Sequence, residues 1–147
     1  MKKIVVAFSL TVVCLLLCFL IAAPIVNNNA AKKTTKKLAD LPLPESTEYI
    51  EDIYKAGKLV GNGNGMQYFG AILIKSELSL EQLKDYYSAF AEHEWECVLE
   101  EQTGTEIKLI EHGRLDFKTD VDTEKYYIVY SWGDNNTIFH EFDIRGH

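Results

Sequence analysis

The chain opens with a long apolar run and then changes to short alternating segments. Residues 4–26 (IVVAFSLTVVCLLLCFLIAAPIV) carry no charge, and only Ser9 and Thr11 are polar. At about 1.5 Å per residue, a helix of this length spans roughly 35 Å, slightly more than the ~30 Å hydrocarbon core of a bilayer. The run therefore predicts an N-terminal transmembrane anchor over residues 1–26, in contact with membrane lipid through residues 4–26.

A cleaved signal peptide is the alternative interpretation of this run, because Lys2 and Lys3 precede it. The apolar stretch is longer than the roughly 7–15 residues typical of such peptides. Pro24 directly follows Ala23, and Asn28 or Asn29 would occupy the −3 position for cleavage after Ala30 or Ala31, so neither site is a clean cleavage motif. We therefore expect an uncleaved signal anchor.

The charges that flank the run bear on its orientation. Four lysines follow within residues 32–37, which favours a cytosolic domain by the positive-inside rule. The very short N-terminal tail favours the opposite orientation, and the neutral spacer 27–31 holds the lysines away from the apolar core. We expect a single-pass protein of the cell membrane with its domain outside the cytoplasm.

Residues 27–41 (NNNAAKKTTKKLADL) show no periodicity of large apolar side chains. They predict a solvated, mobile, basic juxtamembrane linker. Its Lys32–Lys37 segment would face anionic lipid head groups. Leu41-Pro42-Leu43-Pro44 then leads stiffly into a domain over residues 42–147, since proline fixes φ and keeps its predecessor extended.

One helix of this domain is well marked. Ser79 is a natural N-cap, and Gln82 three residues later completes a capping box. Apolar side chains then recur at helical spacing, which predicts a helix from Leu80 to about His93. Its buried side would carry Leu80, Leu83, Tyr87 and Phe90.

The other segments predict β-strands joined by short turns. The segment 66–75 (MQYFGAILIK) is apolar on both faces, as in a central strand. The fold class we expect is α+β: an antiparallel meander of about five or six strands with one principal helix on one face. The predicted strands cover residues 66–75, 95–100, 106–110, 114–121, 126–132 and 137–144, and the segment 49–59 is a further candidate that precedes them.

Charge divides the chain into two unlike parts. Residues 1–39 carry six lysines and no acid, whereas residues 40–147 hold nine bases and all 22 acids, for a net charge of −13. A domain of this charge repels phosphate backbones, which excludes nucleic acid as its ligand. Cys97 is the sole cysteine after the apolar run, so the domain cannot contain an internal disulfide.

Most candidate sites fit structural roles better than chemical ones. The run Gly61–Gly65 (GNGNG) lacks the lysine and following helix of a phosphate-binding loop and predicts a hairpin turn. The alternating acids Asp120, Asp122 and Glu124 lack the glycine and final glutamate of an EF-hand, and predict a solvated turn.

Potential metal ligands and nucleophiles are scattered. The domain's soft ligands show no paired spacing typical of zinc sites, and Cys97 alternates with Trp95 and Leu99 as a buried apolar residue would. We therefore expect no catalytic, cofactor-binding or metal-binding residue. The side chains that could serve such roles are His93, Cys97, His112, His140 and His147, with the acids Glu92, Glu94, Glu96, Glu100 and Glu101.

Three features together resemble a loose class of small, uncharacterised bacterial envelope domains that follow a signal or anchor segment. They are the proline-rich start at 41–48, the helix with the Tyr86-Tyr87 pair, and the turn at Trp95. Glu94 stands where those domains carry glycine. The resemblance covers residues 41–132 and implies the fold, with no known activity.

Two functions fit these observations. The first is a non-enzymatic, membrane-anchored envelope domain that binds a protein or another envelope component. The alternative is a sensing or accessory module for a small molecule or metal ion, which would use the sheet face that the helix leaves uncovered. An enzyme ranks third, since no catalytic constellation is present in the sequence.

Overall fold

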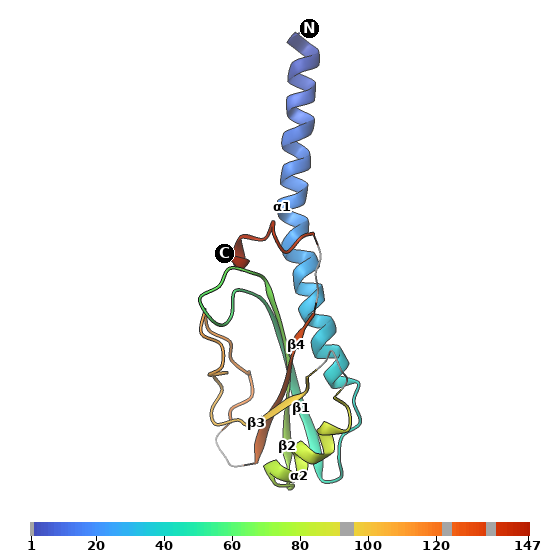
Figure 1. Cartoon of the computed structure of the whole chain (residues 1–147), viewed down its shortest axis with the longest axis vertical. Helices are drawn as coiled ribbons and strands as arrows, with labels where there is room; N and C mark the ends of the chain where they lie inside the picture. The colour runs from blue at the N-terminus through green and yellow to red at the C-terminus, as the bar shows by residue number, and fades with distance from the viewer. Residues whose placement is uncertain (1, 92–95, 122–124, 135–137) are drawn as a thin grey trace.

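The computed structural model describes residues 2–91, 96–121, 125–134 and 138–147. A long helix, α1 (Lys2–Ala39), projects from a domain built on a four-stranded sheet (Figure 1). We call the end of the domain from which α1 projects its membrane-proximal end; α2 lies at the opposite end. The other elements are β1 (Thr47–Gly57), β2 (Gln67–Ser76), α2 (Leu80–Ser88), β3 (Val98–Glu101), β4 (Tyr126–Gly133) and the 3-10 turn η1 (Ile144–Gly146).

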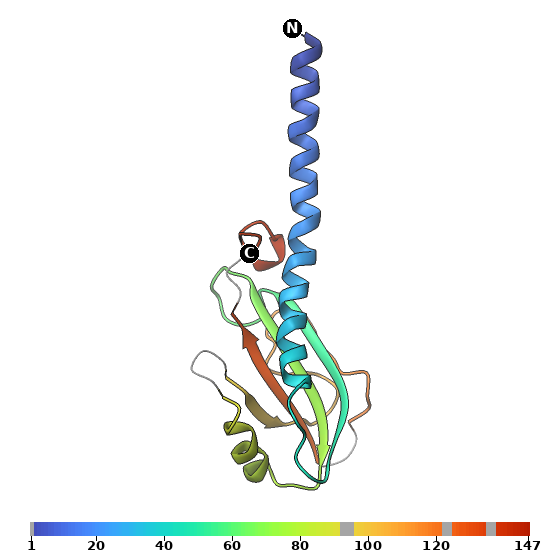
Figure 2. The same ribbon diagram turned by 90° about the vertical axis from the view of Figure 1, so that its right-hand side faces the viewer.

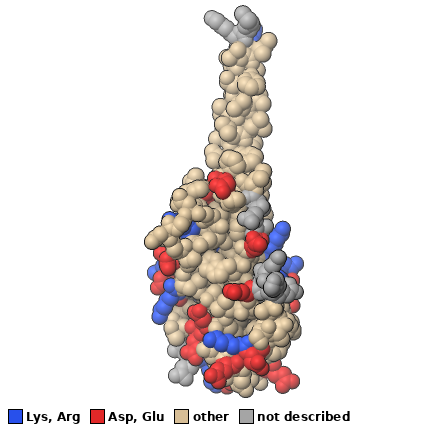
Figure 3. Space-filling view, viewed as in Figure 1, with Lys and Arg blue, Asp and Glu red and all other residues tan. Residues whose placement is uncertain are grey.

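The first half of α1 is exposed and apolar, and it stands clear of the domain as a stem almost free of charge (Figure 3). Within the described residues, α1 is the one helix long and apolar enough to cross a membrane. It fits a transmembrane or signal-anchor helix, as the sequence predicts. Pro24 lies inside it, and the helix continues to Ala39.

The predicted mobile linker over residues 27–41 is wrong, because α1 runs through it to Ala39 and packs on the sheet. Lysines 32, 33, 36 and 37 point to solvent on the outer side of the helix. The helical periodicity was missed because small and polar residues carry it. Those buried are Asn27, Ala30, Ala31, Thr34, Thr35 and Leu38.

Two strand glycines let α1 approach the sheet closely. A Cβ at Gly70 of β2 would lie 2.5 Å from the backbone nitrogen of Thr35, and one at Gly133 of β4 would collide with Thr34. The Thr35 hydroxyl also donates a hydrogen bond of 2.9 Å to the carbonyl of Ile53 in β1. The second half of α1 is therefore part of the domain core.

The sheet has the order β1-β2-β4-β3, and all neighbouring strands are antiparallel. The α+β class is confirmed, and β2 is central and buried as predicted. The expected five or six strands overstate the count, and the order departs from a simple meander because β4 lies between β2 and β3. Helices α1 and α2 cover one face of the sheet (Figure 2).

The other face is also covered, by the irregular segment 102–121. The predicted strands at 106–110 and 114–121 pair only at the single bridge between Glu106 and Asp116. Their apolar side chains instead pack on the sheet, so their alternation reflects burial and not strand pairing. This packing contradicts the expected uncovered face. The main contributors are Ile107, Ile110, Phe117 and Val121.

The remaining differences lie at element ends. Helix α2 has the predicted capping box, with Gln82 N donating to Ser79 Oγ and Ser79 N donating to Gln82 Oε1, but it ends at Ser88 and not near His93. Residues 92–95 lie outside the described part of the chain, as do residues 135–137. From residue 138 onward the predicted strand is instead a series of turns ending in η1.

Candidate membrane-proximal site

Cys97 occupies an inert environment. Its side chain is half-buried against the apolar cluster beneath α2, next to Leu99 and Tyr87. Burial raises the pKa of its thiol to about 11, so little nucleophilic thiolate exists at neutral pH. This agrees with the interpretation of Cys97 as a packing residue, while Trp95 and the candidate ligand His93 lie outside the described residues.

The other candidate ligands remain apart. Within the described ranges, no three His, Cys, Asp or Glu side chains lie where they could hold a metal ion together. His112 Nε2 contacts the Gly61 carbonyl at 2.7 Å, and His140 Nε2 lies 2.8 Å from the neighbouring Glu141. Glu100 accepts a hydrogen bond from the Tyr130 hydroxyl at 2.8 Å.

The remaining candidate residues have structural roles, are exposed to solvent, or lie outside the described residues. Gly61–Gly65 connects β1 to β2, so the predicted hairpin turn is confirmed. His147 Nε2 contacts the Glu141 carbonyl at 3.3 Å. Asp120, Glu96 and Glu101 are exposed. The undescribed residues include Glu92, Glu94, Asp122 and Glu124.

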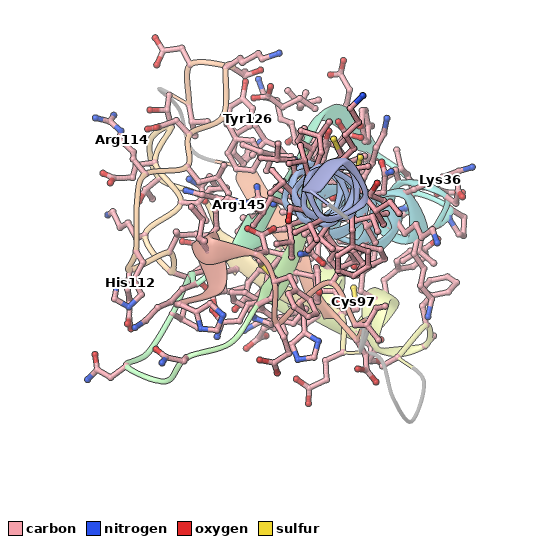
Figure 4. The ribbon with its side chains drawn as sticks, turned by 90° about the horizontal axis from the view of Figure 1, so that it is seen from above. Lys36, Cys97, His112, Arg114, Tyr126 and Arg145 are labelled. Carbon is pink, nitrogen blue, oxygen red and sulfur yellow. The ribbon has the colours of Figure 1, made fainter. Side chains whose placement is uncertain are left out.

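A polar junction joins α1 to the C-terminal segment. Asn27 is fully buried; its Nδ2 donates to Asp143 Oδ2 at 2.9 Å, and its Oδ1 accepts from the Tyr68 hydroxyl at 2.9 Å. Arg145 lies beside α1 in the view from above (Figure 4). Its guanidinium donates to both Asp143 carboxylate oxygens, to Asn28 Oδ1 and to the Pro24 carbonyl.

The junction stabilises a charge away from solvent. Burial by itself raises the pKa of Asp143, but hydrogen bonds from Arg145 and Asn27 outweigh it and bring the pKa down to about 2. Asp143 also accepts from the Arg145 backbone N–H at 3.1 Å. The carboxylate is therefore ionised at neutral pH and holds the C-terminal segment against the helix.

Next to the junction lies a cleft of about 380 Å³. Three of the nine bases in residues 40–147 line it, together with His112, and none of its lining residues is acidic. Lys55 Nζ donates to the Arg114 carbonyl at 3.0 Å, while Lys58 is half-buried at the start of the β1–β2 connection. The three bases are Lys55, Lys58 and Arg145.

Sequence reasoning missed this cleft. Lys55 and Lys58 stand ahead of the glycine-rich turn, whereas Arg145 comes almost ninety residues later, and the segment 102–121 brings His112 between them. The signal available in the sequence was the pair Lys55 and Lys58, two bases three residues apart with no acid between them. Comparison of the chain with protein-family models, curated proteins and solved structures gave no match.

Proposed function

We propose that the chain is a non-enzymatic, single-pass membrane-anchored domain of the cell envelope that binds an acidic envelope component or protein. The observation that carries the proposal is the cationic cleft at the membrane-proximal end. Arg145 is paired with Asp143, so Lys55 and Lys58 supply the net positive charge of the cleft. In a domain of net charge −13, a concave site with this charge is where an anionic group would be attracted. Its location close to α1 would bring the bound component to the membrane surface.

The packing of α1 supports an uncleaved anchor. Cleavage after Ala30 or Ala31 would remove Asn27, which is buried and bonded to Asp143 and Tyr68. It would leave Asp143 with fewer partners in a site that solvent does not enter. The helix is therefore best understood as one continuous unit that both spans the membrane and holds the domain.

This continuity also constrains the proposed lipid contacts of the lysines. At about 1.5 Å per residue, Lys32 lies roughly 9 Å beyond Val26 and Lys37 roughly 16 Å beyond it. Electrostatic attraction to head groups decays over about 8–10 Å at physiological salt. We expect Lys32 and Lys33 to contribute to lipid attraction and Lys36 and Lys37 to contribute little.

The test is site-specific photocrosslinking in intact membranes. A photoreactive amino acid replaces Lys58 in the cleft or, as the matched control, Lys84, an exposed lysine of α2 at the opposite end of the domain. We expect an adduct from position 58 that Lys55→Glu abolishes, and none from position 84. Equal adducts at both positions, or none at position 58, would contradict the proposed binding site.

We also propose that the domain lies outside the cytoplasm, and a cysteine at position 63 tests this orientation. Gly63 is exposed and no other atom lies near its Cβ position, so Gly63→Cys should fold normally. In a Cys97→Ala background, a membrane-impermeant maleimide should label intact cells, after permeabilisation of an outer membrane where one exists. Labelling only after lysis would place the domain in the cytosol.

A further inference from the structure

The large apolar side chains that the domain leaves exposed gather near its C-terminus. Ile138, Phe142 and Ile144 are 68%, 53% and 82% exposed, whereas no other large apolar side chain described after Ala39 exceeds the 41% of Tyr54. All three belong to the segment 138–144, which lies at the membrane-proximal end (Figure 1). Exposure on this scale within seven residues indicates a surface that binds something apolar.

The same segment packs on the apolar half of α1. The ring of Phe19 stacks on Phe139 with centroids 5.0 Å apart, and Phe142 meets it edge-on at 4.9 Å. A groove of about 460 Å³ continues from Phe142 along α1. Its walls are entirely apolar and consist of Val12, Leu15, Leu16, Phe19, Leu20 and Phe142.

The position of Phe19 along α1 gives the depth in the membrane at which its contact with Phe139 and Phe142 would lie. Phe19 precedes Val26 by seven residues, or about 10 Å along the helix axis. The apolar run is about 5 Å longer than the ~30 Å hydrocarbon core, so Phe19 lies roughly 5–10 Å inside the hydrocarbon boundary. Segments that lie in the membrane interface bury their apolar side chains to about the same 5–10 Å.

The segment is held in place from the domain side. The carbonyls of Arg145 and Gly146 accept hydrogen bonds of 2.7 Å from the backbone N–H groups of Lys58 and Gly65. Asp143 bonds to Asn27 at the start of the buried half of α1. Phe139 and Phe142 are therefore fixed beside α1 at one height and do not depend on lipid for their position.

We propose that residues 138–144 form a wedge whose apolar side chains insert into the lipid leaflet nearest the domain, at the point where α1 emerges from the membrane. The inference rests on the proposed anchor, because only a membrane-spanning α1 brings lipid to Phe19. Glu141, exposed and paired with His140, limits the insertion to the depth at which its charge stays among the head groups. The wedge and the helix together fix how the domain is tilted on the membrane.

Spin-label accessibility on the full-length chain tests the wedge in vesicles of phosphatidylethanolamine and phosphatidylglycerol. The native cysteines are replaced by alanine, and single cysteines are introduced at Ile138 and Phe142, at Leu16 in the apolar run, and at Lys84 as a control in α2. Oxygen, which concentrates in lipid, should relax the labels at positions 16, 138 and 142 more than a water-soluble nickel chelate does. The order should reverse at position 84.

The outcomes separate the wedge from the anchor. Lipid contact at position 16 combined with water contact at position 138 or 142 overturns the wedge and leaves the anchor standing. Water contact at position 16 overturns both. Protection of positions 138 and 142 from both relaxants would mean that protein covers them, which also overturns the wedge. Ile138 keeps the test decisive if substitution of Phe142 disturbs its packing on Phe19, because Ile138 is largely exposed.

Discussion

The Asn27 side-chain amide donates a hydrogen bond of 2.9 Å to the Asp143 carboxylate, although 116 residues separate the two. Asn27 is the first residue of α1 after its apolar run, and Asp143 belongs to the C-terminal segment. The contact joins α1 to the C-terminal segment at the level where the proposed membrane ends. It links the height of the domain above the membrane to the position of the helix.

The low pKa of Asp143 predicts an acid-sensitive junction. A carboxylate whose pKa falls to about 2 on folding stabilises the protein fully above its unfolded pKa of about 3.9 and loses this contribution as pH falls toward 2. Asp143→Asn should therefore lower the free energy of unfolding by on the order of 2 kcal/mol at pH 7, and the difference should shrink below pH 4.

Urea unfolding of the full chain in detergent at several pH values measures this difference. Asp116→Asn is the control, since Asp116 forms an exposed pair with Arg114 and should change little. A difference between parent and Asp143→Asn that stays constant from pH 7 to pH 2 would show that Asp143 stabilises the fold without its charge.

Gly70 should be intolerant of a side chain. Gly70→Ala places a methyl group against the Thr35 backbone and must push α1 away from β2, which we expect to cost about 1–3 kcal/mol or more. Gly63→Ala, which meets no neighbouring atom, should change stability by less than about 0.5 kcal/mol. Denaturation midpoints measure both; equal midpoints would mean that α1 does not pack closely on the sheet.

The buried side of α2 predicts a second contrast. Leu83 is a fully buried side chain of α2, so Leu83→Ala should cost about 2–5 kcal/mol, whereas exposed Lys84→Ala should cost less than about 0.5 kcal/mol. Phe90 is half-buried and lies beyond the end of α2, so we expect Phe90→Ala to fall between them. Similar unfolding midpoints for Leu83→Ala and Lys84→Ala would contradict the assigned face.

Cys97 should react slowly with thiol reagents. With a pKa of about 11, its thiolate fraction at pH 7 is about 100-fold or more below that of an ordinary cysteine. Maleimide labelling of the folded chain should be slow, and its rate should rise about tenfold per pH unit past pH 9. Gly63→Cys in a Cys97→Ala background is the exposed reference; a plateau for Cys97 near pH 8.5 would show an unperturbed thiol.

The sequence alone determined the features that depend on local pattern. The uncharged run at residues 4–26 predicted the apolar half of α1, and the Ser79–Gln82 capping box predicted where α2 begins. The doubly apolar segment 66–75 predicted the central strand β2. In each case the signal lies within a few neighbouring residues, so no tertiary contact is needed to interpret it.

The tertiary structure decided the rest. Residues 27–38 have the composition of a linker, yet they form a helix with one buried side, because Gly70 and Gly133 leave room for its small side chains against the sheet. Alternating apolar residues in 106–121 show that one side of the segment is buried, but a strand and an irregular segment that covers the sheet give the same pattern. Whether the segment pairs as a strand depends on partners elsewhere in the chain. The cleft and the Asn27–Asp143 contact join residues far apart in sequence, so local pattern carries no signal for them.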